Sequence, residues 1–125
     1  MNLRTASFAL AVLVVLLLTP ACRKSSAPPP PLAIEQVPAA LSKAFKKTNP
    51  EVKELVNQII SAVQAQDYSR AYLGFQNLAV KPGLDKEQQD VTARGVMTLN
   101  TVLQSAQSSG DSKAAETLKT YRVNK

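Results

Sequence analysis

The strongest constraint on the fold is the spacing of apolar residues after Asn49. They recur every three or four positions, which is the period of one face of an α-helix, and no stretch alternates with the period of two that is typical of strands. The first stripe consists of Val52, Leu55, Val56, Ile59, Ile60 and Val63. Thr48 and Asn49 are candidate caps, Pro50 suits the first turn, and Glu51 follows Thr48 as in a capping box. The pattern therefore predicts a helix over residues 50–66.

Three further helices are predicted, each preceded by an aspartate that can cap it. They begin after Asp67, Asp85 and Asp111, and the first two end near Pro82 and Gly110. Their inward stripes would be Tyr68, Ala71, Tyr72, Phe75 and Leu78, then Val91, Val96, Leu99, Val102, Leu103 and Ala106, then Ala114, Ala115, Leu118 and Tyr121. Because such short connections fold successive helices back on each other, we expect an all-α fold, a small antiparallel helical-hairpin bundle of about four helices over residues 50–125.

The two halves of this region also match each other. A shift of 44 positions superposes Val52 on Val96, Leu55 on Leu99, Ile59 on Leu103, Ala62 on Ala106, Asp67 on Asp111 and Ala71 on Ala115. Apolar positions of any two amphipathic helices can be aligned in this way, so the matched Asp and Ala positions carry the information. Two stacked hairpins that arose by duplication would explain this match, and chance alignment of amphipathic helices is the alternative.

One segment has the spacing of a known repeat. Asp67, Tyr68, Ala71, Phe75 and Pro82 place an aromatic residue, a small residue, a second aromatic residue and a closing proline in order. Over residues 67–82 the chain resembles the second helix of a tetratricopeptide repeat (TPR). The first helix departs from that repeat, which has Leu, Gly and an aromatic residue where this chain has Gln58, Ile59 and Ala62. The resemblance implies a TPR-like hairpin domain.

The beginning of the chain is organised as an export signal. Arg4 supplies a positive charge, Phe8–Leu18 is an uninterrupted apolar run, and small residues come next, before Cys22. A membrane-spanning helix needs about 20 apolar residues, so this run is too short to span a bilayer. It predicts a signal peptide over residues 1–21.

The residues around Cys22 indicate attachment to a membrane after export. Leu18-Thr19-Pro20-Ala21-Cys22 resembles the lipobox of bacterial lipoproteins, with the usual apolar residue displaced to Leu18. The resemblance implies that Cys22 is acylated and that the protein is anchored by lipid in the cell envelope, with Arg23 after the anchor favouring the outer membrane of a double-membraned bacterium. The alternative is an ordinary signal peptide that leaves a free thiol. Cys22 is the only cysteine, so the chain cannot form an internal disulfide.

Residues 22–49 are expected to form a lipid-anchored, Pro-rich, basic linker. The run Pro28–Pro31 favours an extended spacer. A short helix is predicted over residues 38–47, which could lie on the membrane or pack loosely on the bundle. The basic side chains Arg23, Lys24, Lys43, Lys46 and Lys47 face only Glu35 as a carboxylate, and they are candidate contacts with an anionic surface. A merely solvated linker is the alternative.

The residue types present exclude several chemistries. The chain has no His and only one Cys, so neither Cys/His zinc ligation nor a His-based triad is available. Gly74 and Gly95 lie inside predicted helices, where Gly costs about 1 kcal/mol relative to Ala, so they are expected to mark close helix crossings. The sequence predicts no enzyme activity, no metal, no cofactor and no small-molecule substrate. Nucleic-acid binding is not expected, since the basic excess lies in the linker of an exported chain.

The carboxylate pairs have a simpler explanation than catalysis. Glu51 with Glu54, and Glu87 with Asp90, sit in first helical turns, where negative charge complements the helix dipole. Asp90 and Arg94 have the spacing of an i,i+4 ion pair. These pairs are therefore predicted to be caps or solvated side chains.

Two functions remain in competition. The first is a membrane-anchored lipoprotein whose helical domain binds another protein, associates with itself or acts as a structural module. The second is a basic tether that binds an anionic envelope lipid or polymer, with the helical domain as a spacer.

Overall fold

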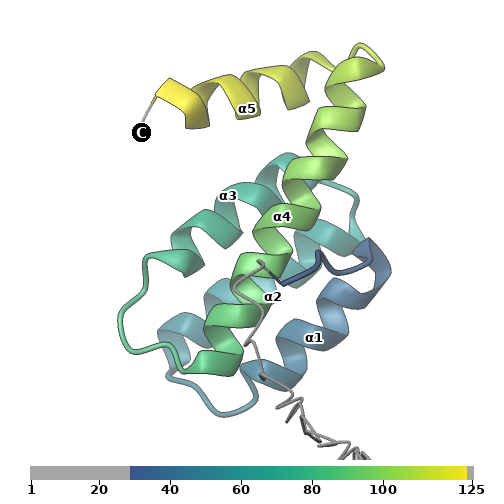
Figure 1. The fold of residues 1–125 in the computed structure, drawn as a ribbon. Helices are drawn as coiled ribbons and strands as arrows, with labels where there is room; N and C mark the ends of the chain where they lie inside the picture. Colours follow the sequence, from purple (N-terminus) through teal and green to yellow (C-terminus); the bar gives the residue numbers. More distant parts are fainter. Residues whose placement is uncertain (1–28, 124–125) are drawn as a thin grey trace, which may run out of the picture.

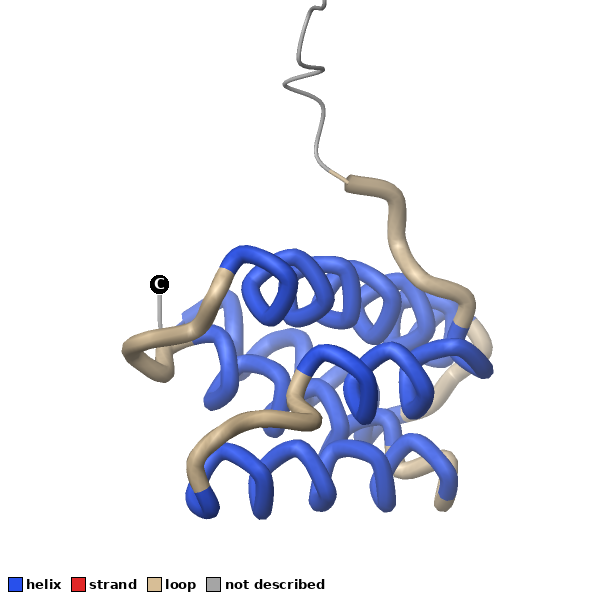
Figure 2. Tube along the Cα trace, turned by 90° about the horizontal axis from the view of Figure 1, so that it is seen from below, coloured by secondary structure: helices blue, strands red, loops and turns tan. Residues whose placement is uncertain are grey.

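Five α-helices and one short 3-10 helix form the fold in this computed structural model, which describes residues 29–123. In chain order they are η1 (Ile34–Gln36), α1 (Val37–Ala44), α2 (Pro50–Gln64), α3 (Tyr68–Ala79), α4 (Lys86–Ser108) and α5 (Ser112–Val123). No strand occurs within that range, so the all-α prediction is confirmed (Figure 2). Helices α2 to α5 correspond to the four helices predicted for the bundle, and α1 corresponds to the short helix predicted over residues 38–47.

Side-chain caps fix where the helices begin. Asn49 Oδ1 accepts a hydrogen bond of 2.9 Å from the Val52 N–H at the start of α2. Asp85 and Gln88 form a reciprocal capping box at α4, with bonds of 2.8 and 3.0 Å. At α2 the cap is Asn49, and Glu51, which was expected to complete a box with Thr48, pairs with Lys81 instead. Local polar side chains thus set the starts of α2 and α4, whereas α1 has no side-chain cap.

The helices pack as consecutive hairpins around one core. Helix α3 lies between α2 and α4, and α5 folds back from the far end of α4 over α3 (Figure 1). The largest fully buried side chains come from four helices: Phe75, Leu41, Ile59, Leu78, Leu99, Leu103 and Val37. Burial of such aliphatic and aromatic side chains is the main stabilising contribution.

Helix α1 belongs to this core, which differs from the expectation for residues 38–47. Val37 and Leu41 are fully buried, and Phe45 is only 2% exposed. The helix packs against both α2 and α4, and Gln88 Nε2 of α4 donates a 3.2 Å hydrogen bond to the Ala44 carbonyl. Its apolar stripe fills the seam between two helices, so it neither packs loosely nor offers that stripe to a membrane. The packed core therefore begins before residue 50.

The turns of the two hairpins have the same backbone pattern. In the turn after α2, Asp67 N–H donates to Ala62 O, and in the turn after α4, Asp111 N–H donates to Ala106 O. The two aspartates then cap α3 and α5 by accepting from the N–H three residues on, at 3.2 and 3.0 Å. The matched turn positions thus make equivalent hydrogen bonds in the two hairpins.

The second helices of the hairpins do not match in the same way. Helix α3 buries Tyr72 and Phe75, whereas the corresponding residues of α5 are Glu116 and Lys119, which are exposed. Helix α5 buries Ala114 and Leu118 instead. The outer face of α5, which carries Glu116 and Lys119, is therefore polar.

Candidate functional site

A groove lies between α3, α4 and α5 because α4 is much longer than α3. Helix α4 has 23 residues and α3 has 12, so α4 projects beyond α3 before α5 turns back (Figure 1). The groove has a volume of about 310 Å³. Its lining combines two tyrosines, several aliphatic side chains, three amides and one arginine: Tyr72, Tyr121, Val96, Met97, Leu118, Gln76, Asn100, Gln104 and Arg122.

Three contacts hold α5 over α3 and so shape this groove. Lys113 Nζ lies 3.0 Å from Asp67 Oδ1, and the Thr117 hydroxyl donates to Ser69 Oγ at 3.0 Å. The rings of Tyr72 and Tyr121 meet edge to face, with centroids 5.2 Å apart. The contacting residues follow the same order along the two helices: Lys113, Thr117 and Tyr121 along α5, and Asp67, Ser69 and Tyr72 along α3. Helices α3 and α5 therefore run parallel. Aromatic pairs of this geometry contribute about 0.5–1.5 kcal/mol beyond their buried area.

The lining is suited to binding a polypeptide. Side-chain amides both donate and accept, so Gln76, Asn100 and Gln104 can pair with the N–H and C=O groups of an extended chain. Arg122 offers a planar donor fork that matches a carboxylate. Burial, with a smaller contribution from Tyr72, raises the pKa of Tyr121, so this hydroxyl stays protonated at neutral pH. The groove therefore presents donors, acceptors and apolar surface.

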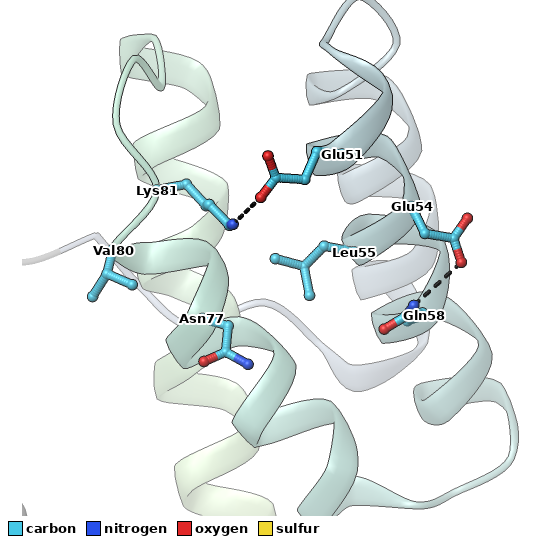
Figure 3. A pocket seen from close by; sticks show the side chains of 7 residues that line it. All are labelled: Glu51, Glu54, Leu55, Gln58, Asn77, Val80 and Lys81. Atoms are coloured by element: carbon cyan, nitrogen blue, oxygen red, sulfur yellow. Dashed lines mark hydrogen bonds and ion pairs between the residues drawn. The ribbon is translucent and has the colours of Figure 1, made fainter.

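A second groove, of about 420 Å³, lies between α2 and α3 (Figure 3). Lys81 and Glu51 reach toward each other at its end, and Gln58 Nε2 donates to Glu54 Oε1 at 3.2 Å. The hydrogen bond from Lys81, together with its charge, holds the pKa of Glu51 below its usual value. A carboxyl shifted in this direction stays ionised and is unsuited to donate a proton at neutral pH. The pair joins α2 to the loop after α3 rather than forming a reactive centre.

The other predicted carboxylate pair also has a structural role. Asp90 Oδ2 lies 3.7 Å from Arg94 Nη1, which confirms the predicted i,i+4 pairing. Within residues 29–123, no group of three or more His, Cys, Asp or Glu side chains is arranged to hold a metal ion. Across the same range, no helix is both long and apolar enough to span a bilayer.

The predicted anionic-surface contacts divide into two groups. Cys22, Arg23 and Lys24 lie outside the described residues. Lys43, at the end of α1, and Lys46 and Lys47, in the loop before α2, are exposed and lie close together in the chain. The fold places them at the end of α1 and in the loop before α2, within the bundle and not on an extended linker.

Contacts between α4 and the segment before η1 were not predicted. Arg94 Nε donates to the Pro30 carbonyl at 2.8 Å, and Thr98 Oγ1 donates to the Leu32 carbonyl at 2.7 Å. The end of the proline run is thus fastened along one face of α4.

A search for known protein families, for related curated proteins and for similar solved structures finds no match to this chain.

Proposed function

We propose that the chain is a lipid-anchored lipoprotein of the bacterial cell envelope whose helical domain binds another protein in the groove between α3, α4 and α5. The proposed localisation rests on residues 1–22 and their resemblance to a signal peptide ending in a lipobox. The interaction rests on one observation: a fixed groove combines a tyrosine pair, three amides and Arg122. Aromatic residues and Arg are the types enriched at protein interfaces.

The bundle is also proposed to be TPR-like. The parallel arrangement of α3 and α5 and the equal turns at Asp67 and Asp111 support two related hairpins. In this description α2 and α4 are the first helices of the hairpins. Because α1 packs against both of them, the surface left for a partner lies on the other side, along α3 and α5.

The proposed occupant is an extended peptide segment of another envelope protein that carries a carboxylate. Arg122 is the only charged side chain of the groove lining, and it selects for negative charge. The amides supply the remaining contacts to the peptide backbone. Such a mode does not require the partner to be folded at the contact.

Site-specific photo-cross-linking in intact cells tests the interaction. A photoreactive residue at Met97 or Gln104 should capture one defined partner, whereas the same residue at exposed Asn57 on α2 should not. Substitution Arg122→Glu should weaken the capture at Met97. Equal capture at Asn57, or none at either groove position, would contradict the groove as the binding site.

The address has its own test. Mass spectrometry of the native protein should find an acylated Cys22 as the first residue, and Cys22→Ser should release the protein from membranes. An unprocessed start or an unmodified thiol would contradict the lipoprotein assignment.

The alternative function, binding of an anionic surface by the basic segment, is favoured by one observation, the exposed cluster of Lys43, Lys46 and Lys47.

A further inference from the structure

Four helix ends meet at one end of the bundle. The loop between α1 and α2 and the loop between α3 and α4 lie there together (Figure 1). Gln88 of α4 is bonded to the Ala44 carbonyl of α1, and Lys81 pairs with Glu51 of α2. We call this region the lysine end, after its members Lys43, Lys46, Lys47, Lys53, Lys81 and Lys86.

The lysine end carries an excess of free positive charge. Its carboxylates are Glu51, Glu54, Asp85 and Glu87, so six lysines face four carboxylates; Lys81 pairs with Glu51, Glu54 accepts from Gln58, and Asp85 caps α4. The five lysines other than Lys81 are exposed, and none of them forms an ion pair among the residues described. Elsewhere in residues 29–123 the charges balance, with Glu35, Asp67, Asp90, Asp111 and Glu116 against Arg70, Arg94, Lys113, Lys119 and Arg122.

The chain before η1 leads toward this end. Leu32 is bonded to Thr98, and Pro30, two residues earlier, is bonded to Arg94, one turn closer to the start of α4. From Leu32 back to Pro30, the chain therefore runs toward Lys86 and the lysine end. The hydrogen bonds from Arg94 and Thr98 of α4 set this direction.

The length of chain before Pro30 limits how far the bundle can stand from an anchor. Eight residue steps separate Cys22 from Pro30, and an extended chain spans at most about 3.5 Å per residue, or about 28 Å in all. Arg94 lies about 12 Å along α4 from Lys86 at the helical rise. Cys22 can therefore lie at most about 16 Å beyond the lysine end. This limit is of the same order as the electrostatic screening length of about 8 Å, so the lysines can lie within reach of charges on the anchoring surface.

We propose that the lysine end is a membrane-facing surface that docks the bundle end-on against an anionic bilayer. This orientation rests on the proposed lipid anchor at Cys22, which brings the surface within reach. The lysines supply charge complementarity to lipid phosphates, and Val80, which is 80% exposed beside them, supplies an apolar contact. The groove beside α5 then extends away from the bilayer, toward a partner.

Vesicle partitioning tests the charge. The probe is the processed chain, residues 22–125, with Cys22→Ser, mixed with vesicles of phosphatidylcholine alone or with half phosphatidylglycerol. Each lysine near an anionic surface contributes roughly a fivefold gain in partitioning, so Lys43→Gln, Lys46→Gln and Lys47→Gln together should weaken binding to phosphatidylglycerol vesicles about a hundredfold. The matched control, Arg70→Gln, Lys119→Gln and Arg122→Gln, removes equal charge outside the lysine end and should change binding less than about threefold.

Two results of this assay would overturn the proposal. Equal losses in both triple variants would show that only net charge matters. Binding of the unsubstituted chain to soluble polyphosphate but not to phosphatidylglycerol vesicles would show that the surface takes an anionic polymer. Circular dichroism of each variant keeps a folding defect distinct from a binding defect.

Fluorescence quenching tests the orientation. In the Cys22→Ser background an introduced cysteine is the only thiol, so a fluorophore can be placed at Val80→Cys on the lysine end or at Gln64→Cys on the opposite end. A quencher on the lipid headgroups should quench the Val80 label several times more than the Gln64 label. Equal quenching, or stronger quenching at Gln64, would overturn the end-on orientation. Neither assay uses the acyl chain, so a bare Cys22 in the native protein would reject the anchor without deciding these outcomes.

Discussion

Gly95 of α4 lies against the ring of Phe75 of α3, so closely that a Cβ at residue 95 would overlap Cε1 and Cζ of that ring. Gly74 has the same relation to α2, where a Cβ would lie 2.6 Å from Ile59 Cγ1. Two glycines thus allow α3 to approach the helices on both sides. This is the role predicted for glycines within helices, where Gly is otherwise unfavourable.

Substitution Gly95→Ala should lower the free energy of unfolding by about 1–3 kcal/mol, because the added methyl group must displace the buried Phe75 ring. The helix-propensity gain of about 1 kcal/mol opposes this loss only in part. Urea unfolding followed by circular dichroism measures the net change. The double variant Gly95→Ala with Phe75→Leu should show favourable coupling, since Leu leaves room for the methyl group. A net increase in stability in Gly95→Ala alone would contradict the close crossing.

Substitution Leu41→Ala should lower the free energy of unfolding by about 2–5 kcal/mol, because Leu41 of α1 is fully buried in the shared core. The adjacent exposed residue provides a control, and Ser42→Ala should change stability by less than about 0.5 kcal/mol. Urea unfolding of both variants measures the difference. A small effect at Leu41 would indicate that α1 packs only loosely on the bundle.

The features that could be predicted from sequence depend on neighbouring residues. Helix starts at Asn49, Asp67, Asp85 and Asp111 follow from a cap and an apolar stripe within a few positions. The role of α1 could not be found in this way. Val37 and Leu41 are buried only because α2 and α4 leave a seam that matches them, and that seam depends on helix packing.

The candidate sites could likewise be predicted only in part, because they depend on how the helices pack. The cluster of Lys43, Lys46 and Lys47 is visible in the sequence, but its proximity to Lys86 requires the α1–α4 contact. The groove depends on the angle at which α5 returns over α3. The length of the predicted third helix, compared with the second, was the available signal for it, because an overhanging helix leaves one face uncovered.

Gln66 and Gly110 occupy equivalent positions in the two matched turns, and both have positive φ, 58° and 93°. A non-glycine residue is strained there, so Gln66→Gly should raise the free energy of unfolding by about 0.5–1 kcal/mol. Conversely, Gly110→Ala should lower it by about 1 kcal/mol. At the last position of α2, Gln64→Gly should be destabilising by up to about 1 kcal/mol, which controls for loss of the Gln side chain. Thermal unfolding of the three variants measures these changes. If Gln64→Gly and Gln66→Gly changed the free energy of unfolding in the same direction, the assigned turn would be contradicted.

Asp67 should make stability depend on pH in the acidic range. The hydrogen bond from Lys113, followed by that from the Arg70 N–H, lowers the pKa of Asp67 below its ordinary value of 3.8 in the folded protein. A carboxyl whose folded pKa is depressed stabilises the fold above its unfolded pKa, and this contribution is lost as pH falls through the folded pKa. The difference in unfolding free energy between the parent chain and Asp67→Asn should therefore be constant above about pH 5 and shrink below about pH 4.

Lys113→Met separates the two causes of this pH dependence. It removes the hydrogen bond and charge of the Lys113 side chain but leaves the Arg70 N–H cap, so the pH-dependent part should become smaller without disappearing. Urea unfolding at a series of pH values gives both curves. Because the Asp67 side chain is 35% exposed and Lys113 is 68% exposed, added salt should reduce the contribution of Lys113 more than that of the backbone cap. Identical pH profiles for the parent chain and Asp67→Asn would show that the α3–α5 ion pair does not form in solution.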